Sequence, residues 1–257
     1  MGILNVTPDS FSDGGHFLEK ERAVKQALAM EKAGAAIIDI GGESSRPGAD
    51  PVDLAEELKR VIPVIEGIRN KSDVLISIDT VKSGVAEQAL QAGANWINDI
   101  SGLRADQNMT AVAKTFQCPV VVMHMQGTPE TMQLKPEYEN VCLEVGDFFE
   151  ERIQTLESAG ILNLILDPGI GFGKRLEDNL DLIRCSGFFR QHGYPLLIGV
   201  SRKSFIGGLT GKEADQRLPG SLAALLLPIQ AGVNIVRVHD VGETRDMITI
   251  LNRLRNA

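Results

Sequence analysis

Acidic and amide side chains follow three of the short apolar runs in this sequence. Asp79, Asn98 and Asp167 each come directly after an isoleucine or leucine that ends such a run. Carboxylates beside an asparagine fit a flat heterocycle with adjacent N–H donors, such as a pterin or a guanine. If these runs end at one place in the fold, we expect the three side chains to bind such a ring together.

Potential cations form a second set of chemically capable residues. Five of them follow apolar runs, namely Arg46, Arg202, Lys203, Arg237 and His239. The chain as a whole is acidic, with 26 lysines and arginines against 34 aspartates and glutamates and a formal net charge of -8. Cations that gather at one place in an acidic protein indicate a ligand with anionic groups.

The segment Ile235–His239 shows how two of these cations share a face. Side chains alternate along a β-strand, so Arg237 and His239 point to one side and the two valines to the other. Because a buried arginine without a partner is costly, Arg237 requires an anion nearby. An arginine with a histidine two residues later fits a phosphate or a pyrophosphate.

Several polar residues also have a structural interpretation. Asp79 or Thr80 is placed to cap the helical stretch that follows, and for Asp99 a capping role is favoured over a catalytic one. His124 fits a hydrogen-bonded wall residue as well as a ligand, and His192 fits a solvated side chain. These residues carry less weight in the functional interpretation.

The glycine-rich segment 167–174 is not a Walker phosphate loop. The GxxxxGK[ST] spacing is absent from it, and a tight strand-to-helix turn accounts for its glycines. The sequence also has no HExxH motif or zinc-binding pattern. Any metal is therefore expected to be a hard cation held by oxygen ligands and phosphate.

Eight strands are predicted to position these residues. Short runs rich in Val, Ile or Leu and bounded by polar residues or glycine are typical of buried parallel strands. The runs are Gly2–Leu4, Ala36–Ile40, Val74–Ile78, Trp96–Ile97, Val120–Met123, Leu164–Leu166, Leu196–Val200 and Ile235–Val238. Helical spacing of apolar residues occurs in Glu19–Ala33, Val52–Asn70, Lys82–Ala92, Asp106–Phe116, Tyr138–Ala159, Leu176–Gln191, Ser221–Ala231 and Gly242–Leu254.

This alternation predicts an α/β fold, a single (β/α)8 TIM barrel with its active site at the C-terminal ends of the strands. An open doubly wound sheet is the alternative. Four helical stretches end in a glycine suited to a left-handed cap, in the pairs Ala33-Gly34, Ala92-Gly93, Ala159-Gly160 and Ala231-Gly232. With no linker or low-complexity segment in view, residues 1–257 are interpreted as one domain.

Composition narrows the class of protein. A pI of about 5.1 argues against nucleic acid or anionic membranes as partners. No apolar run is long enough to span a bilayer, and the N-terminus does not resemble a signal peptide, so we expect a cytoplasmic protein. Three scattered cysteines, Cys118, Cys142 and Cys185, are interpreted as reduced thiols rather than as a disulfide or zinc site.

Eight segments together carry a family resemblance. They are Asn5–Gly15, Gly41–Gly48, Ser77–Thr80, Asn98–Ile100, Met123–Gly127, Leu166–Gly169, Ser201–Ser204 and Arg237–Asp240. In order and in composition these segments resemble the dihydropteroate synthase family of pterin-binding TIM barrels, and they span almost the whole chain. The resemblance implies a folate-pathway transferase that is inhibited by sulfonamides.

The reaction that the resemblance implies joins 6-hydroxymethyl-7,8-dihydropterin pyrophosphate to p-aminobenzoate. Its products are 7,8-dihydropteroate and pyrophosphate, and an SN1-like displacement is expected because an electron-rich dihydropterin can delocalise positive charge. Pyrophosphate becomes a good leaving group once Mg²⁺ and cations neutralise it. The implied cofactor is Mg²⁺ and the implied assembly is a homodimer, with small molecules as the other partners.

The resemblance also implies roles for individual residues. Catalytic roles fall to Lys203, Arg237, His239 and Asp13. Pterin binding falls to Asp79, Asn98, Asp167 and Lys203, pyrophosphate binding to Asn5, Arg237 and His239, and metal binding to Asn5. The p-aminobenzoate site would be formed by Phe11, Ser45, Arg46, Pro47, Lys203 and Ser204. Asp13 and the two early loops would close over the site and exclude water.

Two departures and two alternatives accompany this interpretation. Ser45 stands where many family members carry threonine, and the retained hydroxyl predicts little loss. Family members usually have a segment before the first strand, whereas here the first predicted strand begins at Gly2. The alternatives are a pterin-dependent methyltransferase barrel, which lacks the Ser-Arg-Lys-Ser element, and a non-catalytic paralogue that binds pterin without turnover.

Overall fold

Strands and helices alternate throughout the computed structural model, which describes residues 1–7, 15–45 and 48–255. The strands are β1 (Gly2–Asn5), β2 (Ile37–Gly41), β3 (Leu75–Asp79), β4 (Trp96–Asp99), β5 (Val120–Met123), β6 (Leu164–Asp167), β7 (Leu197–Ile198) and β8 (Ile235–Val236). The helices are α2 (Gly15–Lys32), α3 (Leu54–Arg69), α4 (Ser83–Gln91), α5 (Met109–Phe116), α6 (Val141–Ser158), α7 (Leu176–Arg184), α8 (Ser204–Thr210), α9 (Leu218–Gln230) and α10 (Val241–Arg255), with 3-10 helices η1 (Ser186–His192) and η2 (Ala214–Gln216).

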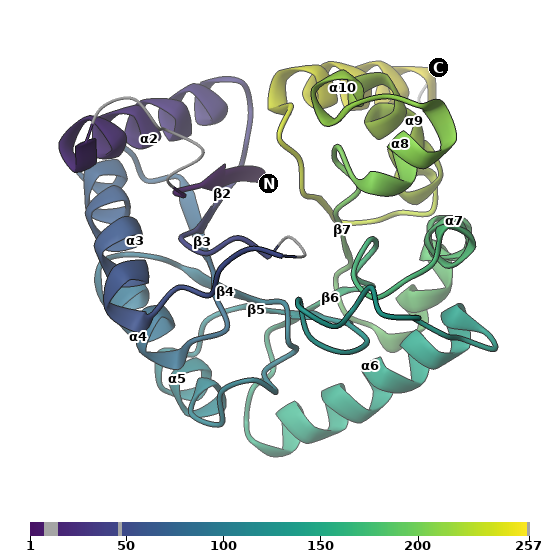
Figure 1. Ribbon diagram of the computed structural model, residues 1–257, viewed down its shortest axis with the longest axis horizontal. Helices are drawn as coiled ribbons and strands as arrows, with labels where there is room; N and C mark the ends of the chain where they lie inside the picture. The colour runs from purple at the N-terminus through teal and green to yellow at the C-terminus, as the bar shows by residue number, and fades with distance from the viewer. Residues whose placement is uncertain (8–14, 46–47, 256–257) are drawn as a thin grey trace.

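The strands form a closed ring inside an outer ring of helices (Figure 1). β1 to β6 are hydrogen-bonded in chain order as one parallel sheet, and β7 and β8 form a second parallel pair. Single parallel bridges close the two seams, one between Gly2 and Val238 and one between Leu166 and Leu196. The predicted (β/α)8 barrel is therefore confirmed.

Alternation along each strand separates the two faces of the barrel wall. Ile38, Ile40, Ile76 and Ile78 are fully buried in the large apolar cluster that joins the strands to the helices. The intervening positions point into the barrel, because neighbouring residues on a strand face opposite sides. At one end of the interior an apolar cluster around Val121 fills the barrel, whereas polar residues occupy the other end.

The helix ends follow the predicted glycine pattern. Gly34 and Gly93 have φ angles of 103° and 112°, which a side chain would disfavour, and the glycines of the other two Ala-Gly pairs also have positive φ. Each of these glycines turns the chain from a helix toward the next strand. Within the described ranges, no helix combines the length and apolar character needed to cross a membrane.

Two helical features differ from the sequence prediction. The stretch predicted as a helix over 176–191 breaks at Cys185, where α7 ends and η1 begins, because Ser186-Gly187 is a poor continuation of an α-helix. The short helix α8 was not predicted, since two glycines in its seven residues hide the apolar spacing.

The expectation of three reduced thiols was wrong for two of the cysteines. Cys142, in the first turn of α6, and Cys185, just after α7, form a disulfide with a Cα–Cα distance of 6.6 Å. The two residues are 43 positions apart, so only the packing of α6 against α7 brings them together. Cys118 is a buried free thiol, as predicted.

Candidate active site

Residues from neighbouring strands form a polar rim inside the barrel at the strands' C-terminal ends. Asn5, Gly41, Asp79 and Asn98 are register partners across β1 to β4, so they lie side by side on one level. Asp167 ends β6 in the same way, opposite Met123 of β5. The polar positions that sequence analysis predicted at separate strand ends are thus brought to one rim.

Arg237 reaches from the end of β8 into this rim and joins two carboxylates. Its Nε donates to Asp39 Oδ2 and its Nη2 to Asp79 Oδ2, both over 2.6 Å. Asn98 Nδ2 donates to the same Asp39 oxygen over 3.0 Å. Although burial alone lowers the pKa of Arg237, the two carboxylates raise it above its ordinary value, so the guanidinium stays charged.

Asp167 and Lys203 form the opposite part of the rim. Asp167 Oδ1 accepts from the Gly169 N–H over 2.8 Å, and Lys203 Nζ donates to the Ile170 carbonyl and lies 4.6 Å from the centre of the Phe172 ring. Burial raises the pKa of Asp167, against the opposing effect of Lys203. Burial lowers the pKa of Lys203 to about 8, and the Asp167 carboxylate limits the change.

The pterin-binding candidates share a common arrangement, in which one polar atom is held by the protein and the other is not. Asp79 uses Oδ2, Asn98 uses Nδ2 and Asp167 uses Oδ1 for the bonds above. The remaining side-chain oxygen of each has no hydrogen-bond partner among the described residues, and none of these oxygens is fully buried. The rim thus carries three acceptors that the protein holds in place, and recognition of a ring with several N–H donors requires such acceptors.

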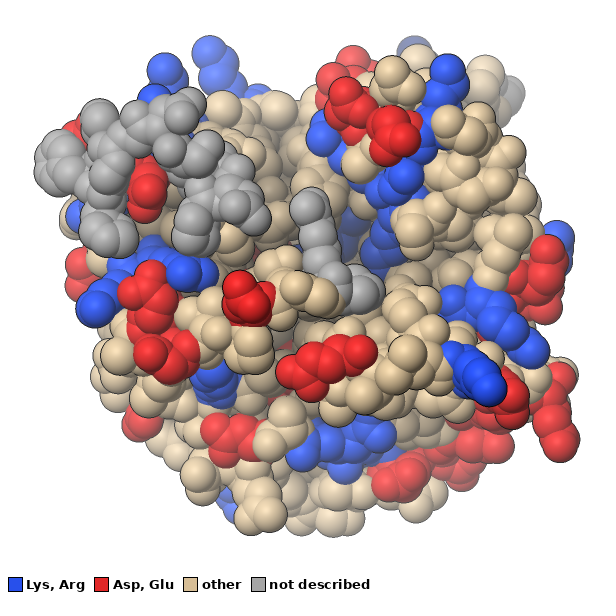
Figure 2. Space-filling model, viewed as in Figure 1, with Lys and Arg blue, Asp and Glu red and all other residues tan. Residues whose placement is uncertain are grey.

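A cavity of about 470 Å³ opens beside this rim. The loops after β2, β3, β4 and β5 line it, with Asp79, Ser45, Ile100 and Arg104 among the contributors. The face of the molecule is hollowed near its centre, and Lys and Arg atoms lie recessed there (Figure 2). The volume is within the range of small-molecule sites.

Comparison with known proteins identifies the family. A family model described as pterin binding enzyme matches residues 1–239. The dihydropteroate synthase of Haemophilus influenzae is 48% identical over 259 residues, covering 100% of this chain and 94% of its own. That of Bacillus subtilis is 44% identical over 258 residues, covering 100% of this chain and 88% of its own. The chain belongs to the dihydropteroate synthase family.

Solved structures of dihydropteroate synthases have the same fold. The Yersinia pestis enzyme with a sulfonamide drug superposes with a TM-score of 0.94 at 44% identity, covering 100% of this chain and 94% of that chain. The Xanthomonas albilineans enzyme with 4-aminobenzoic acid gives 0.94 at 45% identity, and the same enzyme with 7,8-dihydropteroate gives 0.91 at 43%; both cover 100% of this chain and 93% of theirs. Family membership decides against the methyltransferase alternative.

Not every residue expected from the dihydropteroate synthase resemblance can be placed. Phe11, Asp13, Arg46 and Pro47 lie outside the described residues. Ser45 is half-buried at the cavity, whereas Ser204 is exposed in the first turn of α8, directly after Lys203. The p-aminobenzoate site therefore stays a prediction.

Arg202 forms an ion pair with a carboxylate of the protein. Its Nε and Nη2 donate to the two oxygens of Asp240 over 3.0 and 2.5 Å. This pair joins the loop after β7 to the loop after β8.

Asp39 is the functional candidate that sequence reasoning missed. It lies in the middle of β2 between two isoleucines, is fully buried, and holds both Arg237 and Asn98. An aspartate at an inward-pointing position of an otherwise apolar strand was the available signal. The predicted acidic side and cationic side are in direct contact, because Arg237 is bonded to Asp39 and Asp79.

Two of the structural interpretations are corrected. Asp99 does not cap a helix: its Oδ1 accepts from the N–H and the hydroxyl of Ser101 in the turn that follows β4. Thr80 Oγ1 accepts from the Lys82 N–H before α4, whereas Asp79 pairs with Arg237 and caps nothing. Each residue stabilises a turn or the rim, where the sequence analysis had assigned a cap.

His124 is a buried, hydrogen-bonded residue whose ring packs against Phe148 of α6. Its Nδ1 lies 3.0 Å from Nζ of Lys174, which also donates to the backbone carbonyls of His124 and Phe172. Burial, reinforced by Lys174, lowers the pKa of His124 to about 2, and burial lowers the pKa of Lys174 to about 7. His192, predicted to be solvated, is instead half-buried with its ring 6.0 Å from that of Phe149.

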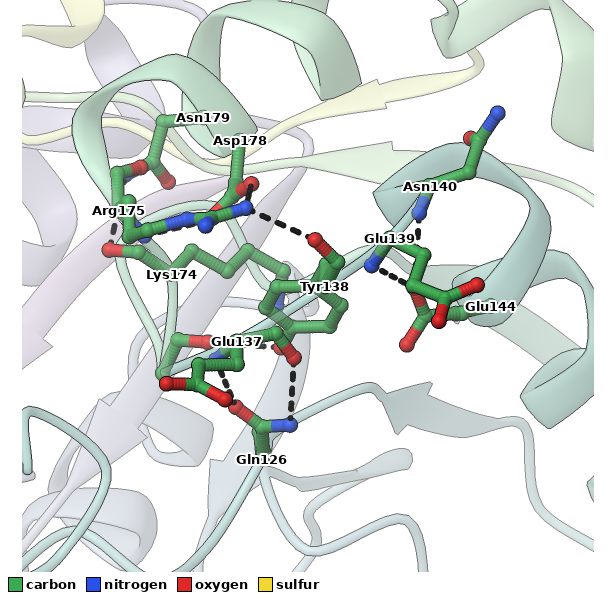
Figure 3. A network of polar contacts seen from close by, with 11 residues as sticks. Gln126, Glu137, Tyr138, Glu139, Asn140, Glu144, Lys174, Arg175, Asp178 and Asn179 are labelled. Carbon is green, nitrogen blue, oxygen red and sulfur yellow. Dashed lines mark hydrogen bonds and ion pairs between the residues drawn. The ribbon is translucent and has the colours of Figure 1, made fainter. Parts of the chain in front are cut away.

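A continuous polar network joins the loops after β5 and β6 (Figure 3). Gln126 makes two bonds of 3.1 Å with the backbone of Glu137, and the Tyr138 hydroxyl donates to the Gly173 carbonyl over 2.7 Å. Arg175 donates to the Tyr138 carbonyl over 3.0 Å. This network fixes the glycine-rich loop on which Asp167 and Lys203 depend.

Proposed function

We propose that this chain condenses 6-hydroxymethyl-7,8-dihydropterin pyrophosphate with p-aminobenzoate to give 7,8-dihydropteroate and pyrophosphate. The observation that carries the proposal is the rim at which Asp79, Asn98 and Asp167 each offer one fixed oxygen beside the charged Arg237. Family membership supports the same activity.

The pterin would bind to the three offered oxygens. Its ring N–H groups and exocyclic amine are donors, and Asp79, Asn98 and Asp167 present acceptors that the protein has already oriented. Lys203 would donate to an acceptor atom of the ring. Gly41 ends β2 and Gly199 directly follows β7, and because neither has a side chain they would leave space at the rim for the ligand.

The diphosphate would bind to Arg237 and His239. Two nitrogens of Arg237 are held by Asp39 and Asp79, and its Nη1 has no partner among the described residues. Because the guanidinium is planar, the two bonds also fix the position of Nη1. Fixed donors stabilise charge that develops on a leaving group without reorganising during the reaction. The electron pair of the CH₂–O bond would leave with the diphosphate, and the amine of p-aminobenzoate would then bond to the CH₂ carbon and release a proton.

Magnesium is proposed as the cofactor, with Asn5 as its protein ligand. Asn5 ends β1, and its amide makes no hydrogen bond to the described residues, so its oxygen fits a hard cation. Among those residues no group of three His, Cys, Asp or Glu side chains forms a metal site. We propose that diphosphate oxygens and water would be further ligands, and the bound ion would neutralise charge on the departing diphosphate.

We further propose that the protein is a cytoplasmic homodimer and that residues 1–257 form one domain. Helix α9 contains no charged residue, and its Leu226 and Leu227 are exposed, as are Ile250 and Leu254 of α10. Arg255 of α10 donates to the Ile229 carbonyl of α9, so the two helices are neighbours. Exposed apolar side chains on two neighbouring helices suit a second copy of the same chain.

Replacing Arg237 with alanine tests the function. We expect R237A to lower kcat by roughly 10²–10³-fold, as for loss of one fixed donor to a developing charge. Pyrophosphate release that depends on both substrates and Mg²⁺ is the measurement, and R184A, which removes an exposed arginine paired only with Asp181, is the matched control. A wild-type chain that binds pterin without releasing pyrophosphate would identify a non-catalytic paralogue.

A further inference from the structure

Ser201 contacts His239 through two separate hydrogen bonds. Ser201 follows β7 and His239 follows β8, so the contact joins the loops at the ends of the two-stranded sheet. The backbone N–H of His239 donates to Ser201 Oγ over 3.2 Å, and the same Oγ lies 3.0 Å from His239 Nδ1. Ser201 is buried, with only 6% of its surface exposed.

These two bonds favour one of the two tautomers of the neutral His239 ring. A serine hydroxyl has one hydrogen to donate, and Ser201 Oγ already accepts from the His239 N–H. Its only other contact in the described part of the chain is Nδ1, so a buried hydroxyl is satisfied when it donates to that nitrogen. Nδ1 then accepts, and in a neutral imidazole the proton must be on Nε2.

The backbone around Ser201 is held firmly enough to keep this geometry. Arg202 adopts a left-handed conformation with φ of 58°, and its N–H donates to Ser221 Oγ over 2.8 Å. Its guanidinium makes the two bonds to Asp240, the residue directly after His239. Ser201 and His239 are therefore each next to a residue of an ion pair that joins the same two loops.

We propose that Ser201 is a positioning residue that holds His239 as the Nε2–H tautomer, so that Nε2 acts as a hydrogen-bond donor to the diphosphate. His239 lies two residues after Arg237, beyond the end of β8, and the proposed function assigns both residues to the diphosphate. The inference rests on that proposed function for the identity of the ligand. The tautomer itself can be measured without any substrate.

Two alanine variants form a matched pair. Ser201→Ala removes the hydroxyl that contacts His239, and S186A removes the hydroxyl of another buried serine, which donates only to the Ile183 carbonyl over 3.1 Å. S201T keeps a hydroxyl at the position and tests for rescue. Thermal unfolding of all three shows whether each variant is folded before it is compared.

The first measurement is the tautomer, read from ¹H–¹⁵N correlations of histidine-labelled full-length protein at about pH 8.5, where an ordinary imidazole is neutral. The chain has four histidines, and H239Q identifies the signals of His239 by their loss. We expect Nε2–H in the wild type, S186A and S201T. In S201A we expect the two tautomers to be mixed.

The second measurement is the affinity for inorganic pyrophosphate, by titration calorimetry on the same samples. We expect binding to S201A to be weaker by roughly 3–10-fold, which corresponds to the loss of one hydrogen bond. S186A and S201T should stay within about 2-fold of the wild type. Binding of the pterin alcohol that lacks the diphosphate should not change in any of them.

The outcomes separate this inference from the proposed function. A wild-type His239 with its proton on Nδ1, or on both nitrogens, overturns the inference, and so does an S201A protein whose tautomer is unchanged. An S201A protein that is less stable but binds pyrophosphate normally assigns Ser201 a purely structural role and also overturns it. Absence of dihydropteroate formation in the wild type would instead reject the proposed function and leave the tautomer result standing.

Discussion

At the scale of single residues, the candidate site depends on side chains of which the protein fixes one polar atom and leaves another for the ligand. Asp167 is the clearest case, because the Gly169 N–H holds Oδ1. We expect D167N to weaken pterin affinity by roughly 10–100-fold, since charge-assisted bonds are lost while the shape is kept. Calorimetry with a pterin lacking the diphosphate measures this, with D181N as an exposed control, and unchanged affinity would count against the pterin assignment.

Lys203 leads to a prediction about pH. Burial lowers its pKa to about 8, so the ammonium that would hold substrate is lost as the pH rises through that value. We expect kcat/KM for the pterin substrate to fall above about pH 8, approaching tenfold per pH unit. In K203R, where the guanidinium stays charged, the decline should move to higher pH. A wild-type profile that is flat to about pH 10 would contradict this role.

Sequence reasoning identified the residues at strand ends but not the one in a strand interior. Asp79, Asn98 and Asp167 follow apolar runs, and the rule that barrel sites lie at strand ends was sufficient to find them. Asp39 escaped because an apolar run was interpreted as strand without asking which side each residue faces. Individual side-chain pairs could not be predicted either: the predicted barrel makes the loops after β7 and β8 neighbours, but it does not show that Arg202 bonds to Asp240.

At the scale of the elements, a glycine, Gly199, directly follows β7 and leaves room for the ligand where a side chain would otherwise stand. A Cβ added at Gly199 would lie 3.7 Å from Arg237 Cβ and 4.0 Å from Lys203 Nζ, which are ordinary contacts. We therefore expect G199A to fold as stably as the wild type, or up to about 1 kcal/mol more stably, and yet to bind pterin more weakly because a methyl group takes ligand space. Chemical denaturation and calorimetry measure the two effects.

The matched control for that variant is G208A in α8, where an added Cβ meets nothing within 4 Å. G208A should leave pterin affinity unchanged. If G199A binds pterin like the wild type, the end of β7 does not border the ligand, and the proposed position of the ring is wrong.

The strands themselves were predictable because each is a short apolar run between polar neighbours. All eight predicted runs overlap an observed strand. The short helix α8 and the break at Cys185 were not predictable in the same way, since glycine obscures the helical spacing at both places. Local composition thus determines the strands more clearly than it does short or broken helices.

At the scale of the whole molecule, α9 and α10 present the proposed dimer surface. Leu227 is 51% exposed on α9, and we expect L227E to convert the dimer to monomers, because a charge would be buried in an apolar interface. Light scattering at several concentrations measures the mass. L162E is the control, since Leu162 is 65% exposed but lies outside these two helices. A wild-type monomer at every concentration would reject the dimer.

The closing of the barrel could be predicted only by counting the strand–helix units in the sequence. The two seams rest on single bridges, at Gly2 with Val238 and at Leu166 with Leu196, and no local pattern announces them. The disulfide between Cys142 and Cys185 was missed for the same reason, because spacing along the chain says little about distance in space.

The division of the wall into a six-stranded and a two-stranded sheet also divides the chemistry. The carboxylates and amides of the rim stand on the larger sheet, whereas Lys203, Arg237 and His239 all follow β7 or β8. The ion pairs from Arg237 to Asp39 and Asp79 therefore connect the two sheets across a boundary between acidic and basic residues. Any shift of the two-stranded sheet would move the three cations together. It would change the distance between the residues proposed to hold the pterin ring and those proposed to hold the diphosphate, without deforming either sheet.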